Sequence, residues 1–109
     1  MKPLFLALIA ATSLLQAQSS TQSIIGTITD TECADANHSR MRMGDTDAEC
    51  TNACVEFHDA TYMLFDGKVT YELSDQKAAA SFAGKKVKVT GTVDAKAKRI
   101  AVASIAEPK

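Results

Sequence analysis

The chain has 109 residues, of which 46% are hydrophobic and 23% charged, and its formal net charge is −1 at pH 7. A chain of this length holds one domain. Its near-neutral charge argues against general binding to nucleic acid or to an anionic membrane surface, because both select basic proteins. We therefore expect neither partner.

The first 17 residues have the three parts of a secretory signal peptide. Lys2 supplies the positive start, residues 4–15 form an apolar run, and Ala17 is the small residue at the cleavage site. The run is shorter than the roughly 20 residues that cross a membrane. We therefore predict a cleaved signal peptide at residues 1–17, a polar linker at 18–23, and a periplasmic or secreted protein without a membrane anchor. Cleavage two residues later is an alternative.

Residues 24–106 form the predicted domain, which begins with a strand and a long loop. Residues 24–29 are rich in β-branched side chains, which favour a strand. Residues 30–45 offer few side chains to bury, so we expect an irregular loop there. Thr46 and Glu49 then form a capping box, in which each side chain bonds to the other's backbone N–H, and this predicts a short helix.

A hairpin is the clearest local signal in the chain. Residues 62–65 and 68–73 flank Asp66 and Gly67, a pair typical of a two-residue turn because both positions favour positive φ. That turn places Leu64 opposite Val69. One face then collects the side chains that we expect in the core: Tyr62, Leu64, Val69, Tyr71 and Leu73.

The last part of the chain predicts a helix followed by two strands. Ser74 is the expected cap of a helix over residues 75–83, which Gly84 ends. Residues 86–93 alternate between apolar and polar side chains, and residues 99–105 form the last strand. Five strands with this helix between the third and the fourth predict a mainly β fold with some α content, a small OB-like Greek-key barrel. A split α+β sheet is the alternative.

The chain also carries a series of motifs along its length. A first strand ends in Asp30, Cys33 and His38 follow, and two further cysteines are separated by three residues. The segments YELSDQ and FAGKKVKVTGTVD come next. Together these motifs resemble an uncharacterised family of small exported bacterial proteins with an OB-like barrel and a Cys/His-containing first loop. The resemblance implies this fold and export, but no activity.

Three cysteines and a histidine are candidate metal ligands. The predicted short helix, which runs to about residue 57, carries Cys50 and Cys54 one turn apart. Two thiolates so placed can bind one ion but are poorly placed to bond with each other. Cys33 and His38 lie on the preceding loop and can complete a set of four ligands, which suits zinc or copper. Weaker candidate ligands are His58, Met41 and Met43.

A disulfide is the alternative use of the cysteines. Cys33 paired with Cys50 or Cys54 would stabilise the loop, and export favours such a bond. It leaves one thiol unpaired, whereas a metal uses all three. Thiol redox chemistry is a further option, although Cys50 and Cys54 lack the two-residue spacing of thioredoxin-like centres. We therefore interpret the chain as a binding module and not an enzyme, with a disulfide-stapled structural or protein-interaction domain as the alternative.

Overall fold

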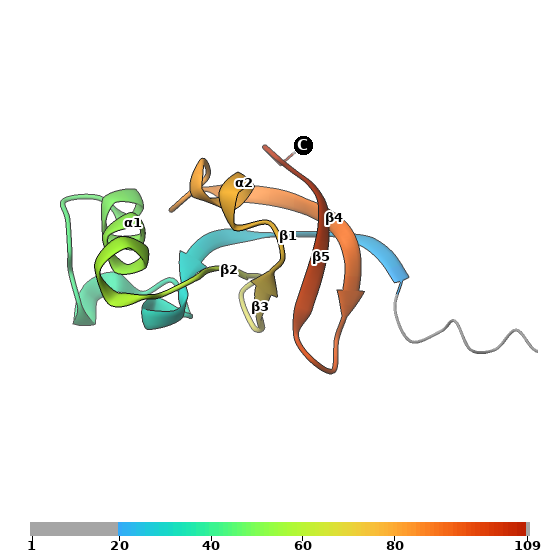
Figure 1. Ribbon diagram of the computed structural model, residues 1–109, viewed down its shortest axis with the longest axis horizontal. Coiled ribbons are helices and arrows are strands. Elements are labelled where there is room, and N and C mark those ends of the chain that lie inside the picture. Colours follow the sequence, from blue (N-terminus) through green and yellow to red (C-terminus); the bar gives the residue numbers. More distant parts are fainter. Residues whose placement is uncertain (1–19, 109) are drawn as a thin grey trace, which may run out of the picture.

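The computed structural model describes residues 20–108 and shows a closed five-stranded barrel with two α-helices (Figure 1). In chain order the elements are β1 (Ser20–Asp30), α1 (Asp47–His58), β2 (Tyr62–Phe65), β3 (Thr70–Leu73), α2 (Gln76–Ala80), β4 (Lys86–Asp94) and β5 (Arg99–Ala106). Two 3-10 turns, Thr31–Cys33 and His38–Arg40, lie between β1 and α1. The prediction of a mainly β barrel is thus confirmed. The predicted signal peptide lies outside the described residues.

β1 is the longest strand and pairs with two partners. Its residues from Thr27 to Asp30 pair antiparallel with β2, and its first part pairs antiparallel with β4. The strand begins at Ser20, so most of the predicted linker at 18–23 is strand instead. The physical reason is that residues 21–23, although polar and exposed, lie in register with β4, and the Ser23 and Thr90 hydroxyls hydrogen-bond at 2.8 Å.

β3 and β5 close the barrel through a short parallel pairing. The strand order around the barrel is β1-β2-β3-β5-β4, and Glu72 lies opposite Arg99 at the closing pair. The Gln76 amide strengthens this region. Its oxygen accepts from the Tyr62 N–H at 2.8 Å, and its nitrogen donates to the carbonyls of Tyr62 at 2.9 Å and Leu73 at 3.0 Å.

The core fills the barrel with apolar side chains from every strand. One buried residue from each strand is at most 3% exposed: Ile28, Leu64, Leu73, Val87 and Ile100. The alternation predicted for residues 86–93 is confirmed, because the valines of β4 point inward. Each fully buried side chain of this size stabilises the fold by roughly 1.5–3 kcal/mol.

The hairpin of β2 and β3 has a longer turn than the sequence predicted. Leu64 lies opposite Tyr71 and not Val69, so the register is shifted by two residues. Asp66 is the reason: its Oδ1 accepts from the N–H groups of Lys68 and Val69, both at 2.8 Å, and its own N–H donates to the Val69 carbonyl at 3.0 Å. A shift of two residues leaves the same face of each strand pointing inward.

α1 has the predicted N-cap at Thr46, but Glu49 does not complete the predicted capping box. The Thr46 hydroxyl accepts a hydrogen bond from the Glu49 N–H at 3.1 Å, which is the expected N-cap. The Glu49 carboxylate bonds instead to the N–H of Asp45, at 2.9 Å, and so fixes the end of the preceding loop.

α2 is shorter than predicted and has a different cap. The sequence predicted a helix over residues 75–83 capped by Ser74, whereas the helix spans Gln76–Ala80. Asp75 is the cap, because its Oδ1 accepts from the Ala78 N–H at 2.9 Å. The Ser74 hydroxyl is engaged elsewhere, since it accepts from the Val102 N–H of β5 at 2.9 Å.

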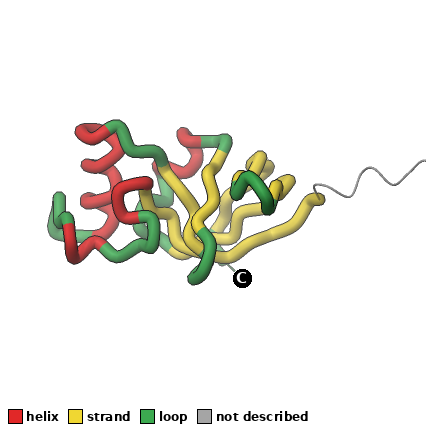
Figure 2. The backbone as a smooth tube through the Cα atoms, turned by 90° about the horizontal axis from the view of Figure 1, so that it is seen from below, coloured by secondary structure: helices red, strands yellow, loops and turns green. Residues whose placement is uncertain are grey.

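α1 and the loop before it lie at one end of the barrel (Figure 2). The first turn of α1 packs against Gly84, where an added Cβ would come within 2.6 Å of the Ala48 nitrogen. This close approach and the φ of 76° at Gly84 require glycine there. Among the described residues, no helix has the length and apolar character needed to span a membrane.

Candidate metal centre

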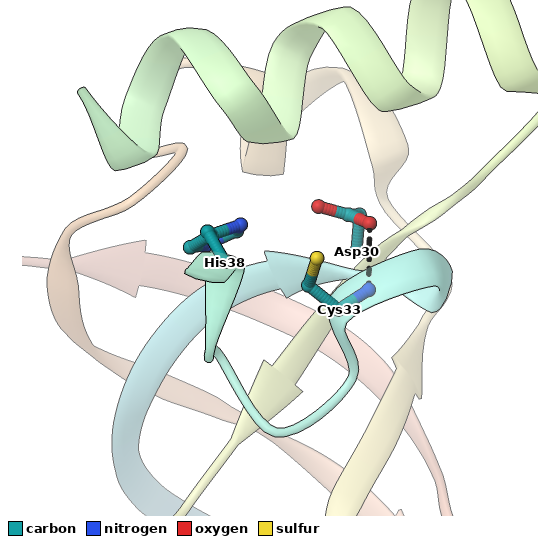
Figure 3. Close-up of side chains that lie close together, drawn as sticks. All are labelled: Asp30, Cys33 and His38. Carbon is teal, nitrogen blue, oxygen red and sulfur yellow. Dashed lines mark hydrogen bonds between the residues drawn. The ribbon is translucent and has the colours of Figure 1, made fainter. Parts of the chain in front are cut away.

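Three buried side chains converge where β1 ends beneath α1. They are the Asp30 carboxylate, the Cys33 thiol and the His38 imidazole, and one ligand atom from each lies within 4.8 Å of the others. Asp30 is 0% exposed, Cys33 2% and His38 4%. Figure 3 shows the three groups facing a common space below the helix. One oxygen, one sulfur and one nitrogen donor therefore meet in a site closed to solvent.

Asp30 is held rigidly by the backbone that follows it. It is the last residue of β1 and the N-cap of the first 3-10 turn, where its Oδ1 accepts from the N–H groups of Glu32 at 2.9 Å and Cys33 at 3.0 Å. Its other oxygen, Oδ2, is buried and has no hydrogen-bond partner. The capping bonds thus fix the carboxylate so that one oxygen remains for a ligand.

Cys33 lies at the end of the same turn. The Thr29 hydroxyl donates to its carbonyl oxygen at 2.6 Å, which joins the turn to the end of β1. Burial, followed by the negative charge of Asp30, raises the pKa of the Cys33 thiol. In the metal-free protein this thiol is therefore protonated at neutral pH, and a bound cation would displace the proton.

His38 reaches the cluster from the second 3-10 turn. Asn37 caps that turn, because its Oδ1 accepts from the Ser39 N–H at 3.0 Å. The chain between Cys33 and His38 includes Ala36 at a φ of 61°, a left-handed conformation that alanine rarely adopts. With the backbone in this conformation the His38 imidazole is buried, and its Nδ1 has no hydrogen-bond partner.

The unpaired buried atoms concentrate in this cluster. Within residues 20–108, three buried side-chain nitrogen or oxygen atoms have no hydrogen-bond partner: Asp30 Oδ2, His38 Nδ1 and Thr51 Oγ1. Burying an unpaired polar group is costly, and most such groups in folded proteins are paired. Two of the three atoms belong to Asp30 and His38, which are both members of the 4.8 Å group.

The sequence predicted Cys50 as a ligand, and the structure places its thiol against the loop backbone. The Cys50 Sγ donates to the Met41 carbonyl at 3.3 Å and accepts from the Met43 N–H at 3.4 Å. These bonds hold the loop against α1. The side chains of Met41 and Met43, the weaker candidates, are half-buried.

Cys54 lies one turn further along α1 and is 0% exposed. Burial, followed by the charges of Asp30, Cys50 and Cys33, raises its pKa to about 12. Asp30 is the first of these charges, so the carboxylate and the Cys54 thiol act on each other. Its position differs from that of Cys50, which faces the loop backbone.

The structure brings together two of the predicted ligands, Cys33 and His38, and adds Asp30, which sequence reasoning missed as a candidate ligand. The available signal was an acid at the end of a strand, three residues before a cysteine, where it can cap the next turn. His58 lies exposed in the last turn of α1 and is not a member of the group formed by Asp30, Cys33 and His38. All three cysteines are free thiols in this structure.

No protein-family model, no curated protein and no solved structure matches this chain.

Proposed function

We propose that this protein is a small exported binding module that holds one zinc ion between its first loop and α1. Asp30, Cys33 and His38 supply three ligands, and Cys54 supplies the fourth. The observation that carries the proposal is that Asp30 Oδ2 and His38 Nδ1 are buried and unpaired in the same cluster. A cation accepts a lone pair from each of them and offsets the charge of the buried carboxylate.

The donor set favours zinc over copper(I). Zinc binds cysteine, histidine and aspartate ligands in tetrahedral sites, whereas copper(I) prefers sulfur donors. The sequence alone predicted three thiolates and one imidazole, which suit either metal. With the Asp30 carboxylate in place of one of those thiolates, the ligand set contains one soft sulfur donor fewer and one hard oxygen donor more. Copper(I) is therefore the less suitable ion.

Cys54 and Cys50 have different roles in this proposal. The charge of Asp30, followed by those of Cys50 and Cys33, acts on the buried Cys54 thiol, which supports Cys54 as the fourth ligand. The Cys50 thiol is occupied by the backbone of Met41 and Met43, so Cys50 holds the loop that carries His38. A shell of four protein ligands leaves no open position, and such zinc sites are usually structural.

We propose also that the barrel is of the OB-like Greek-key type. The strand order β1-β2-β3-β5-β4, the parallel pairing of β3 with β5 and the long β1 shared between two partners support this. In such barrels the loop between the first two strands commonly carries the binding residues. Here that loop contains Cys33 and His38.

Export is the proposal for the first residues of the chain. Lys2, the apolar run at 4–15 and Ala17 support it, as does the resemblance to a family of exported proteins. The mass of the protein recovered from the periplasm tests it. We expect a chain that begins at Gln18 or Ser20, and recovery of the full-length chain only from the cytoplasm would contradict export.

Zinc titration of two matched histidine variants tests the metal site. The full chain is reduced, freed of metal with a chelator, and titrated against a chromophoric chelator that competes for zinc. We expect one zinc per chain, loss of binding in His38→Gln, and retained binding in His58→Gln, because His58 is exposed. Equal binding by both variants, or no binding by the reduced wild-type chain, would overturn the proposal.

Cobalt(II) in place of zinc tests the assignment of the two helix thiols. The charge-transfer absorption of a cobalt–thiolate site depends on the number of thiolates. We expect the band to fall by roughly half in Cys54→Ser, which loses one of two thiolate ligands. Cys50→Ser should retain the full band, and the opposite pattern would show that Cys50 is the ligand.

A further inference from the structure

The first part of β1 has a free edge, although the barrel is closed. β4 pairs with residues 20–27 of β1, whereas β2 pairs with the opposite edge only from Thr27 onward. In the described part of the chain no other strand pairs with β1, so this opposite edge has no strand partner before Thr27. Figure 1 shows the first part of β1, in blue, extending beyond β2 and β3.

Three residues of this segment direct their backbone N–H and carbonyl groups to the free edge. The Ile28 N–H donates to the carbonyl of Lys85, just before β4, at 3.0 Å, so the even-numbered residues of β1 face β4. Backbone groups point alternately to the two edges of a strand. The residues whose groups point away from β4 before Thr27 are therefore Thr21, Ser23 and Ile25.

The sequence of this segment does not protect the edge against pairing. Natural proteins commonly block an exposed strand edge with lysine, with proline or with a covering segment. Residues 18–29 contain no charged residue and no proline, and Ile25 is 47% exposed. The turn after β2 leaves the edge open, because a groove of about 300 Å³ is lined by residues that include Ile25, Phe65 and Gly67. A second strand therefore has room to pair here.

The outer edge of β5, by contrast, has such protection. The Ser74 N–H donates to the Ile100 carbonyl at 3.1 Å, and the Ser74 hydroxyl accepts from the Val102 N–H at 2.9 Å. The strand ends at Ala106, and a glutamate and a proline follow it directly. The two edges therefore differ in their chemistry, and only that of β1 is left suited to pairing.

We propose that two copies of the protein pair antiparallel through this edge of β1, with Ser23 on the two-fold axis. Thr21 then lies opposite Ile25 of the second copy, and Ser23 lies opposite itself. All three outward-facing residues exchange both of their backbone hydrogen bonds, about six bonds in total. A two-fold axis requires one segment that is complementary to itself, and this register uses every outward-facing residue of the free edge.

The side chains of the segment also favour a second copy as the partner. Residues that lie directly opposite each other across the four strands form rows. The row on the axis contains Ser23 and Thr90 from each copy, and within one copy their hydroxyls already hydrogen-bond at 2.8 Å. The next row contains Lys88 and Ile25 of one copy, then Thr21 and Thr92 of the other. No two charges meet in either row, and hydroxyl pairs stabilise neighbouring strands.

Analytical ultracentrifugation of the purified full chain over a range of concentrations tests the proposal. We expect a monomer–dimer equilibrium for the wild type. Ile25→Lys should raise the dissociation constant by at least about 10-fold, because a lysine blocks an edge and the symmetry places each substitution in the interface twice. Thr92→Lys is the matched control, because Thr92 is also exposed but β4 is paired on both edges there. The control should dimerise as the wild type does.

Hydrogen exchange at single amides locates the contact in the wild-type chain. As the concentration rises, exchange should slow at Thr21, Ser23 and Ile25, whereas the Ile24 amide, which faces β4, should exchange slowly at every concentration. A wild-type chain that stays monomeric, or equal dimerisation of the two lysine variants, would overturn the inference. Protection of the three amides in the monomer would also overturn it, because another segment of the same chain would then cover the edge.

This inference is independent of the metal site. Asp30 is the last residue of β1, whereas the pairing uses the first part of the strand. A chain that binds no zinc would still be expected to dimerise, and a monomer would still be expected to bind zinc. The failure of either proposal is therefore distinguishable from the failure of the other.

Discussion

Replacing Asp30 by asparagine should weaken metal binding without disturbing the fold around the site. Asparagine keeps the Oδ1 that accepts from the N–H groups of Glu32 and Cys33, so the first 3-10 turn keeps its cap. It replaces the unpaired Oδ2 by a neutral amide nitrogen. A buried neutral group costs less than a buried charge, so metal-free Asp30→Asn should unfold at the same temperature as the wild type or above it.

The effect of zinc on the two proteins should differ strongly. At a zinc concentration of about 100 times Kd, binding stabilises the wild type by about 2.7 kcal/mol. For a domain of this size each kcal/mol shifts Tm by roughly 4–8 °C, so zinc should raise Tm by about 10–20 °C. If the substitution weakens binding about 100-fold, the same zinc concentration supplies only about 0.4 kcal/mol, or roughly 2–3 °C.

Thermal unfolding followed by circular dichroism, with zinc and with a chelator, measures both quantities. Asp35→Asn is the matched control, because Asp35 is an exposed acid on the same loop that accepts from the Asn37 N–H and pairs with Arg40. It should keep the full zinc-dependent shift. An undiminished shift in Asp30→Asn would refute the reasoning that its carboxylate binds the metal.

Three further predictions concern the metal-free protein. The pKa of Cys54 is about 12 in the folded protein, against 9.0 for an unperturbed thiol, so the thiol loses its proton at lower pH in the unfolded chain. The free energy of unfolding should therefore fall by about 1.4 kcal/mol per pH unit above about pH 9. Urea titrations that gave the same slope for Cys54→Ala would contradict this. Ala36→Gly should raise the free energy of unfolding by up to about 1 kcal/mol, because glycine relieves the φ of 61°, and a loss of stability in the same titration would argue against that conformation. Gly91→Ala should lower the free energy of unfolding by about 2 kcal/mol or more, since the new Cβ meets the Ala101 carbonyl oxygen. Thr92→Ala is the control, because this neighbouring position is exposed and its substitution should change the free energy of unfolding little.

Local signals predicted much of the fold. The alternating valines of β4 and the β-branched run before Asp30 indicated strands because their side-chain pattern has the period of a sheet. Thr46 indicated the start of α1 because its hydroxyl can satisfy the N–H three residues on. Registers and element ends were less predictable. The turn at Asp66 depends on which N–H groups the side chain accepts, and the start of β1 depends on the presence of β4 beside it.

The candidate site, like the fold, was predictable in part from local sequence and depended in part on tertiary contacts. The sequence by itself determined which chemical groups are present: Cys33 and His38 on a loop that has little else to bury, and Cys50 and Cys54 one turn apart on a helix. Only the tertiary structure decided which of these groups lie together. The loop folds back beneath α1, so His38 meets the carboxylate at the end of β1, and the Cys50 thiol bonds to the loop backbone instead. Ligand sets form between elements that are distant in the chain, and local patterns carry no information on which of them become neighbours.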